Sequence, residues 1–328
     1  MTYTIEKVTT LIGARRYGDN DTNIGFILTD SRSLCFPEET LFFALKSERN
    51  DGHNYIPELY RRGVKNFVVT NVPKGYASDY PGANFLKVVN TLEALQRLAE
   101  RHRDEFNIPI VGITGSNGKT MVKEWLYQLL SPSMFVTRSP RSYNSQIGVP
   151  LSVWLMNEQT QVGVFEAGIS MPGEMLALRD IIQPTIAVLT NLGAAHQENF
   201  SSMEEKCREK LILFHDAETV IYDGDDEVIS KVIAEYPDYK GEKLFWSLKN
   251  AEAPFYVKNI EKQQSVSVIT YIYKGVEDSF SIPFIDDASV QNAIISAVVA
   301  SKLGLSAEDI DKRMAQLEPV AMRLAAKI

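Results

Sequence analysis

The residues with the clearest chemical meaning form one short run between an apolar segment and a helix-like segment. They are Gly115, Ser116, Asn117, Gly118, Lys119 and Thr120. In that context a glycine-rich turn lets backbone N–H groups face phosphates, and the helix N-terminus adds a favourable field. Lys119 would bridge the β- and γ-phosphates of a nucleotide, and the Thr120 hydroxyl would be a ligand of Mg²⁺. The alternative is a glycine turn before a polar helix start, but the six-residue match in this context favours a phosphate site.

One position departs from the usual phosphate loop, G-x-x-x-x-G-K-[ST]. Counting back from Gly118, the first glycine should stand at 113, where the chain has Ile113, and a glycine lies one place upstream, at Gly112. The pattern is therefore a variant of the loop.

Two further polar residues follow apolar runs that read as strands. Glu166 ends the run 162–166, and His196 follows the run 185–191 after a short loop. Ligands of doubly wound folds bind at the carboxyl ends of the strands, so Glu166 suits a Mg²⁺ ligand and His196 would lie beside the same sheet edge. Each residue taken alone also fits a solvated side chain at a strand end or in a loop.

Lys210 lies beside the apolar stripe of a predicted helix. Ser202 suits the N-cap and Glu205 completes a capping box. At about 100° per residue, Met203, Cys207 and Phe214 fall within roughly 40° of one another, and Lys210 lies only about 20° from them. An unpaired buried charge is costly, so this lysine either has a function or pairs with an acid or extends to solvent. By contrast, the acidic run 223–227 is interpreted as the cap of the following helix.

The elements that must position these residues alternate between strands and helices. From about Pro109, apolar runs at 108–114, 162–168, 185–191 and 218–224 alternate with amphipathic segments, which predicts a mostly parallel sheet covered by helices. The alternating runs 255–260 and 266–273 predict a small antiparallel excursion, and a helix is expected over 288–304. Before Pro109, the strand-like runs 40–45 and 66–70 and the helical runs 55–63 and 91–106 predict a separate α/β unit. The fold class is therefore α/β.

The composition excludes several classes of protein. The chain has 328 residues and a formal net charge of -8, which argues against a nucleic-acid partner. No apolar run is long enough to span a membrane, and residues 1–10 lack the features of an export signal. Only Cys35 and Cys207 are present, which fits a reducing cytoplasm.

The loop "GITGSNGKT" resembles the "GxTGTNGKT" loop of the Mur ligases and the folylpolyglutamate synthetases, in which the early glycine stands where Gly112 does. The resemblance implies ATP, two Mg²⁺ ions and the formation of an amide through an acyl phosphate. The segment 199–214 is similar to the family's "xFGSxExIAxAKxEI", with Ser201, Glu209 and Ile212 as departures. In that family the lysine matched by Lys210 is carbamylated. An ammonium about 4 Å from Mg²⁺ would be repelled by about 8 kcal/mol at an effective dielectric of 20, whereas a carbamate is an anionic ligand. By this resemblance Thr120, Glu166, His196 and carbamylated Lys210 hold the metals, and Lys119, Lys210, His196 and Glu166 are the catalytic set.

Further segments resemble the branch of the family that adds D-alanyl-D-alanine to UDP-N-acetylmuramoyl-tripeptide. The elements "DSR" and "LFFAL" match the domain that receives the UDP-sugar, which implies that Asp30, Ser31 and Arg32 line that site. "SYNSQIGVPLSVW" resembles "NxNNxIGVPLTLL", with Asn144 matched and Ser145 replacing an asparagine. Asn292 is the expected adenine contact, with Gln291 where the family has a histidine. Arg323, in a segment that resembles "PVxGRLE", is expected to contribute to the ATP site.

The resemblance also implies a domain organisation. We expect a UDP-sugar-binding domain at 1–106, an ATP-binding domain at 107–315, and at 316–328 the start of a C-terminal domain that would hold the amine substrate. Without that domain we expect little or no ligation. The variants at 141–154 and 286–294 look most like a ligase fused to an alanine racemase. Three other interpretations stay open: another Mur ligase or a folylpolyglutamate-type synthetase, a non-catalytic module that binds ATP or a UDP-sugar, and a P-loop kinase.

Overall fold

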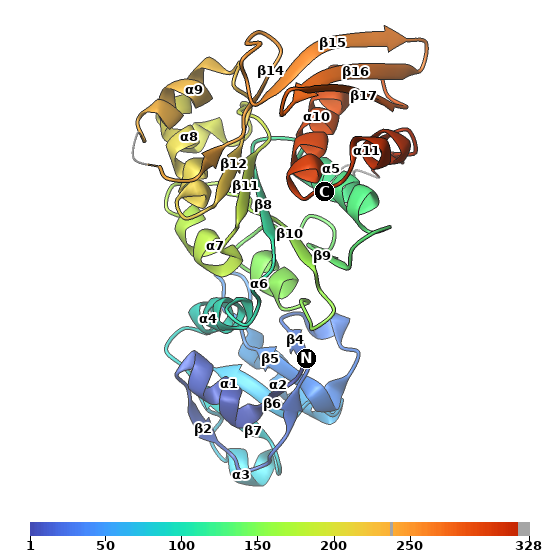
Figure 1. The fold of residues 1–328 in the computed structure, drawn as a ribbon. Coiled ribbons are helices and arrows are strands. Elements are labelled where there is room, and N and C mark those ends of the chain that lie inside the picture. Colours follow the sequence, from blue (N-terminus) through green and yellow to red (C-terminus); the bar gives the residue numbers. More distant parts are fainter. Residues whose placement is uncertain (237–238, 321–328) are drawn as a thin grey trace. The chain divides into compact units, whose positions relative to one another are not determined.

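The computed structural model describes residues 1–236 and 239–320, and the chain divides into two compact units. The first unit comprises residues 1–106 together with 153–158. The second unit holds the remainder of the described chain (Figure 1).

The first unit is built on a five-stranded sheet with the order β2-β7-β6-β5-β4. Its strands are β2 (Arg15–Tyr17), β4 (Phe26–Leu28), β5 (Thr40–Phe43), β6 (Asn66–Val69) and β7 (Asn84–Lys87). All neighbours in it are parallel except β2, which pairs antiparallel with β7. A two-stranded sheet of β1 (Tyr3–Thr4) and β3 (Asn23–Ile24) completes the unit's strands among the described residues.

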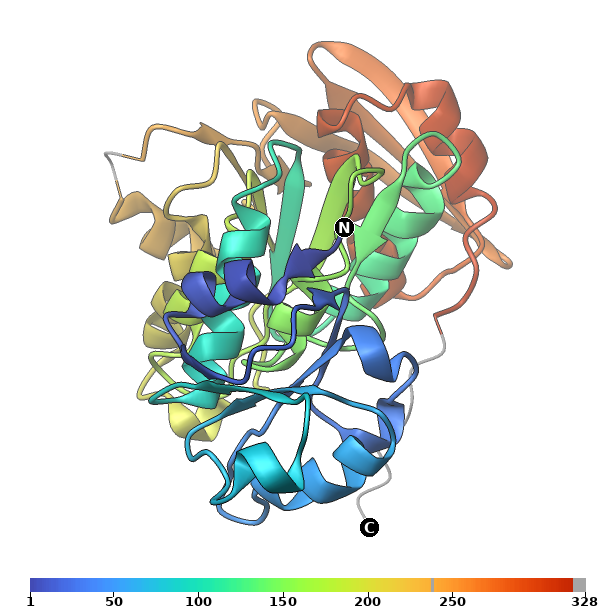
Figure 2. The same cartoon turned by 90° about the horizontal axis from the view of Figure 1, so that it is seen from below.

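Both faces of the five-stranded sheet are covered at its centre, so the inner strands β5 and β6 are buried throughout. The helices of the unit are α1 (Ile5–Ile12), α2 (Ile56–Arg61), α3 (Tyr76–Asp79) and α4 (Thr91–Arg103), with 3₁₀ turns at Ser31–Ser33, Pro37–Glu39 and Gly52–Tyr55. Leu41 and Phe43 pack with α1 and α4, which lie side by side (Figure 2). Phe42, which points the opposite way, packs with Ile56 and Leu59 of α2.

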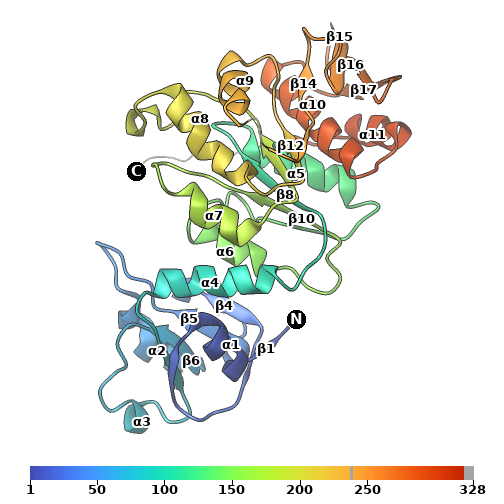
Figure 3. The ribbon, with the colours of Figure 1, turned by 60° about the vertical axis from the view of Figure 1, so that its left-hand side comes forward.

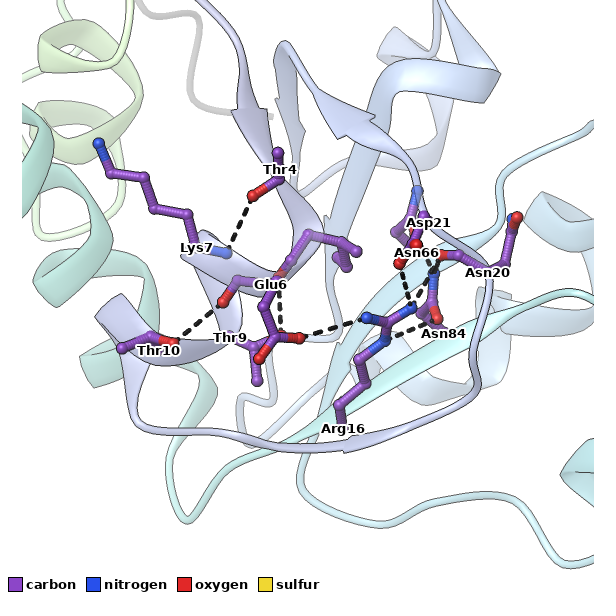
Figure 4. Close-up of polar contacts among 11 residues, drawn as sticks. Thr4, Glu6, Lys7, Thr9, Thr10, Arg16, Asn20, Asp21, Asn66 and Asn84 are labelled. Atoms are coloured by element: carbon purple, nitrogen blue, oxygen red, sulfur yellow. Dashed lines mark hydrogen bonds and ion pairs between the residues drawn. The ribbon is translucent and has the colours of Figure 1, made fainter.

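A polar cluster around Arg16 ties the edge strand β2 to the rest of this unit (Figure 4). The Arg16 guanidinium donates to Asn84 Oδ1 at 3.1 Å and to the Asn20 carbonyl at 3.0 Å, and it lies 3.3 Å from Glu6. The Asn84 amide in turn donates to Asn66 Oδ1 at 2.9 Å. One cation thus connects strands β2, β6 and β7 with helix α1.

The second unit contains a six-stranded, wholly parallel sheet with the order β13-β12-β11-β8-β10-β9. Its strands are β8 (Ile110–Thr114), β9 (Val136–Arg138), β10 (Val162–Glu166), β11 (Ile186–Leu189), β12 (Thr219–Ile221) and β13 (Glu242–Lys243). The predicted fold class, with a mostly parallel sheet flanked by helices, is confirmed.

Helices cover both faces of this sheet (Figures 1 and 3). The helices of this unit are α5 (Lys119–Leu130), α6 (Gly148–Val153), α7 (Met175–Ile182), α8 (Met203–Leu211), α9 (Glu227–Ala234), α10 (Asp287–Lys302) and α11 (Ala307–Met314), with 3₁₀ turns at Gln197–Asn199 and Ile212–Phe214. Helices α5 and α10 pack against one face through a core that includes Ile113, Val188 and Trp125. In Figures 1 and 3, α7, α8 and α9 lie on the opposite side of the sheet.

A second sheet follows the parallel one along the chain. Its strands are β14 (Trp246–Ser247), β15 (Phe255–Gln263), β16 (Val266–Tyr273) and β17 (Val276–Ile282), and β15, β16 and β17 are antiparallel neighbours. The first two of these three were predicted, whereas β17 was missed. Among the described residues no helix has the length and apolar character needed to cross a membrane.

Candidate active site

The loop 115–118 leaves the end of β8 and leads directly into α5, which begins at Lys119. Gly115 and Gly118 both have positive φ, at 145° and 82°. A Cβ at Gly115 would lie 1.9 Å from Thr190 Oγ1, and one at Gly118 would lie 2.4 Å from Asn292 Oδ1. Both glycines are therefore required by backbone conformation and by space.

The side chain at position 113 is part of the hydrophobic core, which explains why a glycine is absent there. Ile113 is fully buried beneath α5, whereas Gly112 points to the other face of the sheet, where a Cβ would lie 3.0 Å from Pro184 Cβ. The glycine that the loop pattern lacks is thus replaced by a core side chain of β8.

The loop is fastened to the segment that follows the neighbouring strand β11. The Ser116 and Asn117 backbone N–H groups donate to the carbonyl and side-chain oxygens of Asn191, at 3.0 and 3.1 Å. Thr190 Oγ1 donates to the Asn117 carbonyl at 2.5 Å, and the Gly193 N–H donates to Ser116 Oγ at 2.9 Å. The loop is therefore held in shape by protein contacts alone.

A half-buried and a buried lysine, Lys119 and Lys210, meet at this loop. Lys119 Nζ donates to the Gly115 carbonyl at 2.7 Å, and Lys210 Nζ donates to the same oxygen at 3.3 Å. Lys210 is 3% exposed, so the prediction that it lies on the buried side of its helix is confirmed. Burial first, and then the charges of Lys119 and Lys206, together lower the pKa of Lys210 to about 7. Burial also lowers the pKa of Lys119.

Helix α8 begins where the sequence predicts. Ser202 is the N-cap, and its side chain accepts from the Glu205 N–H. The Glu205 carboxylate accepts mainly from the backbone N–H and the hydroxyl of Ser201, one residue before the N-cap, and a weaker contribution from the Ser202 N–H also lowers its pKa. Likewise, Asp226 of the acidic run 223–227 caps α9 by accepting from the Ile229 N–H, so its interpretation as a helix cap is confirmed.

Glu166 gathers oxygen-bearing side chains at the end of β10. Thr120 Oγ1 donates to Glu166 Oε2 at 3.0 Å and lies 3.3 Å from Ser142 Oγ, and Asn144 Nδ2 is 3.5 Å from the same carboxylate oxygen. Glu166 is fully buried; among the described residues its Oε1 atom accepts no hydrogen bond of good geometry, but it lies 3.0 Å from the Lys123 ammonium in an ion pair. Carboxylate, hydroxyl and amide oxygens are the ligands that Mg²⁺ prefers, so this donor set fits a magnesium ion.

His196 is placed differently from the other predicted metal ligands. It is exposed and has a left-handed φ of 58°, and no hydrogen bond or ion pair of its imidazole to a described residue is seen; its carbonyl accepts from the Asn199 N–H at 3.2 Å. The part of the chain that the structure describes contains no cluster of three or more His, Cys, Asp and Glu side chains able to hold a metal. The structure thus brings Thr120 to Glu166 and Lys210 to the loop, but it shows no contact that joins His196 to them.

Two buried lysines of this region were missed by the sequence analysis. Lys123 lies one helical turn after Lys119 and is 3.0 Å from Glu166 Oε1. Lys206 lies one turn before Lys210, and its ammonium donates to the carbonyls of Gly193 and Ala195. The spacing of four residues from Lys119 and from Lys210 places each on the same helical face as its partner, which is the signal that could have found them.

Asn292 on α10 packs directly on the loop. Its Nδ2 atom lies 3.2 Å from Met121 Sδ, while its buried Oδ1 atom has no hydrogen-bond partner. An amide oriented beside Gly118 with a free acceptor is consistent with a contact to a nucleotide base. The neighbouring Gln291 lies 3.5 Å from Asp223 Oδ2.

The residues expected at the UDP-sugar site lie in the first unit. Asp30 caps the short turn Ser31–Ser33, and the Arg32 guanidinium lies 2.6 Å from Asp30 Oδ2. Nε and Nη2 of Arg32 already donate to Asp30, and the side chain is 87% exposed, so its remaining donors are accessible to an anion. Arg323, the last of the predicted ATP contacts, lies outside the described residues.

The sequence of this chain is similar to those of known proteins. The family model of the Mur ligase middle domain matches residues 113–300. The UDP-N-acetylmuramoyl-tripeptide–D-alanyl-D-alanine ligase of Bacillus subtilis is 29% identical over 310 residues, which are 92% of this chain and 64% of that protein. The chain thus spans less than two thirds of the length of this relative.

Solved structures agree with the sequence relatives. A crystal structure of MurF from Acinetobacter baumannii matches 99% of this chain and 70% of its own, at 25% identity and a TM-score of 0.88. MurF from Thermotoga maritima in complex with ADP matches 90% of this chain and 66% of its own, at 25% identity and a TM-score of 0.77. The names of these relatives give no support to the expected fusion with a racemase. The family match covers more than half of the sequence, from the end of β8 to α10, and the chain therefore belongs to the Mur ligase family.

Proposed function

We propose that this chain carries the nucleotide-binding and acyl-activating site of an ATP-dependent amide ligase. The reaction is the addition of D-alanyl-D-alanine to UDP-N-acetylmuramoyl-tripeptide, a cytoplasmic step of peptidoglycan precursor synthesis. The observation that carries the proposal is the convergence of Lys119 and Lys210 on the Gly115 carbonyl, at one end of a preformed phosphate loop. The names of the Bacillus and Acinetobacter relatives support the choice of substrates.

The loop binds the triphosphate through its backbone and its lysine. The N–H groups at the start of α5 lie at a helix N-terminus, where negative charge is favoured. Lys119 sits at this end with its ammonium already buried, so it is placed to offset charge on the transferring phosphoryl group. Asn292, with its free Oδ1 beside Gly118, contacts the adenine.

The oxygen cluster at Glu166 holds Mg²⁺, with Thr120 as a second ligand. Bound Mg²⁺ would neutralise charge on the phosphate oxygens. Lys210, as a carbamate, with His196 and Glu166 would hold a second ion. Because burial lowers the pKa of Lys210 to about 7, much of this lysine is a neutral amine near neutral pH, and that is the form that reacts with CO₂.

The residues of the chain act mainly by positioning the reactants. The substrate carboxylate attacks the γ-phosphate, giving an acyl phosphate and ADP, and the amine of D-alanyl-D-alanine then displaces phosphate from the acyl carbon. Holding the reacting groups in line can supply several kcal/mol of the barrier reduction. Asn144, beside Glu166, is the residue of this chain that we assign to the substrate end of the site. Asp30, Ser31 and Arg32 receive the UDP moiety in the first unit, with Arg32 on the diphosphate.

Trapping the acyl phosphate tests this function without the amine substrate. The chain is incubated with ATP, Mg²⁺, UDP-N-acetylmuramoyl-tripeptide and hydroxylamine, and formation of the hydroxamate is measured. We expect hydroxamate that requires both ATP and the UDP-tripeptide and is lost in Lys119→Met. Phosphate transfer to a hydroxyl group of an added substrate, with no hydroxamate, would instead identify a kinase.

A further inference from the structure

Lys123 is a fully buried cation beside the proposed metal site. Its side chain and that of Glu166 are both 0% exposed, and its Nζ lies 3.0 Å from Glu166 Oε1. The same ammonium donates to the Ser139 carbonyl at 2.8 Å and to the Arg141 carbonyl. Lys123 Nζ is also 3.1 Å from Glu124 Oε1, which is 3.0 Å from Arg138 at its other oxygen.

These contacts join the three segments that form the oxygen cluster. Helix α5 supplies Thr120 and Lys123, the end of β10 supplies Glu166, and the segment 139–144 supplies Ser142 and Asn144. The Glu166 N–H also donates to Ser139 Oγ at 3.2 Å, so the segment 139–144 is bound to β10 as well as to Lys123. One ammonium therefore fixes the positions of the side chains that surround Thr120.

The two oxygens of Glu166 have different partners. Oε1 faces Lys123, while Oε2 accepts from Thr120 and faces Asn144. The ion pair with Lys123 at Oε1 restricts the orientation of the carboxylate. The other oxygen, Oε2, then faces the Thr120 hydroxyl, the proposed ligand of Mg²⁺.

The conformation of the segment 139–144 also depends on Lys123. Arg141 has a left-handed φ of 49°, a conformation that residues with a Cβ adopt uncommonly and at some cost in energy. Its carbonyl is one of the acceptors of Lys123. Lys123 thus donates to the backbone carbonyl of Arg141, the residue directly before Ser142.

We propose that Lys123 is a positioning residue of the metal site. It holds Glu166 so that Oε2 is presented to Mg²⁺, and it holds the segment 139–144 against that carboxylate. The proposal rests on the proposed nucleotide and magnesium site. A buried ion pair is by itself a weak stabiliser, because the cost of taking both charges out of water offsets their attraction. Stability alone therefore does not account for this lysine.

The test compares ADP binding with and without Mg²⁺, measured by calorimetry on the whole chain. In the unaltered chain we expect Mg²⁺ to tighten ADP binding. We call the ratio of the ADP affinities with and without Mg²⁺ the Mg²⁺ gain. In Lys123→Met this gain should fall at least tenfold, while the affinity for ADP without Mg²⁺ changes less than threefold. Glu124→Gln is the matched control, because it removes the other acidic partner of Lys123 and leaves Glu166 in place. It should keep the full gain.

Lys123→Arg is the second variant, in case the methionine variant does not fold. It keeps the charge, but a planar guanidinium cannot serve Oε1 and the two carbonyls with the geometry of an ammonium. We expect its Mg²⁺ gain to fall at least threefold, with ADP binding in the absence of Mg²⁺ preserved. A merely structural lysine would weaken both kinds of binding together.

The outcomes separate this inference from the proposed function. If the unaltered chain binds no ADP, or binds it equally with and without Mg²⁺, the proposed function is overturned and this inference with it. If the unaltered chain shows the gain and a folded Lys123 variant retains it in full, only the role of Lys123 is overturned. A loss of the gain in Glu124→Gln equal to that in Lys123→Met would also contradict it.

Discussion

The side-chain nitrogens of Lys119 and Lys210 share one acceptor, the carbonyl oxygen of Gly115, at 2.7 and 3.3 Å. Two ammonium groups directed at one oxygen lie close enough for their like charges to repel. The charge of Lys119 accordingly contributes to the lowered pKa of Lys210, after burial itself. The site is therefore poised to gain negative charge, either from a phosphate or from modification of Lys210.

Replacing Lys210 by methionine should stabilise the nucleotide-free protein at neutral pH. The folded state lowers the pKa of Lys210 from 10.5 to about 7, so folding disfavours the ammonium. The resulting cost is absent above pH 10.5 and grows as the pH falls toward 7. We expect Lys210→Met to raise Tm by roughly 3–6 °C at pH 7 in bicarbonate-free buffer, and by less at pH 10. Differential scanning calorimetry at both pH values checks this, with the exposed Lys312→Met as control. Equal shifts at the two pH values would contradict it.

Gly118→Ala should damage the phosphate loop through both strain and collision. The residue has φ of 82°, and a Cβ would lie 2.4 Å from Asn292 Oδ1. Gly82→Ala is the matched control, because Gly82 has φ of 73° but open space around it. The control should cost about 1–2 kcal/mol of unfolding free energy, and Gly118→Ala about 1–3 kcal/mol more. ADP affinity should fall at least tenfold only in Gly118→Ala, and unchanged affinity in that variant would count against the loop assignment.

The first unit should lose stability in mild acid because of His102. His102 Nε2 donates to the Met156 carbonyl at 3.0 Å, so Nδ1 is left to accept from the Tyr3 hydroxyl at 2.8 Å. Burial lowers the pKa of His102 from 6.5 to about 4, which means that the folded state holds the neutral ring. The stability that this contributes is present above pH 6.5 and is lost as the pH falls from 6.5 to 4, by up to about 3 kcal/mol.

Urea unfolding between pH 7 and pH 4 measures this effect. His102→Gln should be less stable at pH 7 and should show a flatter dependence on pH over that window. The exposed His215→Gln should behave as the unaltered chain does. A His102→Gln profile as steep as that of the unaltered chain would show that another group is responsible.

The Arg16 cluster should contribute to the stability of the first unit. Arg16→Met would leave Asn84 Oδ1 without its donor and the Asn20 carbonyl with only the Asn84 amide as donor, and a loss of about 1–3 kcal/mol is expected. Arg15 precedes it on the same strand and is exposed, so Arg15→Met provides the matched control. Chemical unfolding of the two variants should differ by at least about 1 kcal/mol. Equal stabilities would indicate that solvent replaces the bonds of Arg16.

The sequence predicted the parallel sheet because β8, β10 and β11 are buried on both faces and read as continuous apolar runs. It missed β17, whose first four residues are all partly or fully exposed and include Glu277 and Asp278. A strand with one solvated half carries little of the apolar signal on which the prediction depended.

The site was predictable where local pattern decides the outcome. Lys210 was identified as buried because the helical period places it beside Cys207. Lys123 and Lys206 were not identified, although their spacing of four residues from Lys119 and Lys210 places them on the same helical faces. Their carbonyl acceptors, at 139–141 and 193–195, come from loops outside their helices, so the helical pattern alone does not identify these partners. The position of the His196 side chain likewise depends on the left-handed backbone conformation of His196 itself, which the sequence did not indicate.

Modification of Lys210 is the most direct test of the proposed site. The chain is equilibrated with ADP, Mg²⁺ and ¹³C-bicarbonate, and the carbamate carbon is observed by ¹³C NMR. We expect one carbamate resonance that is absent from Lys210→Ala and retained in Lys206→Met, the matched buried lysine on the same helix face. No carbamate signal in the unaltered chain, or a signal that survives in Lys210→Ala, would contradict the account.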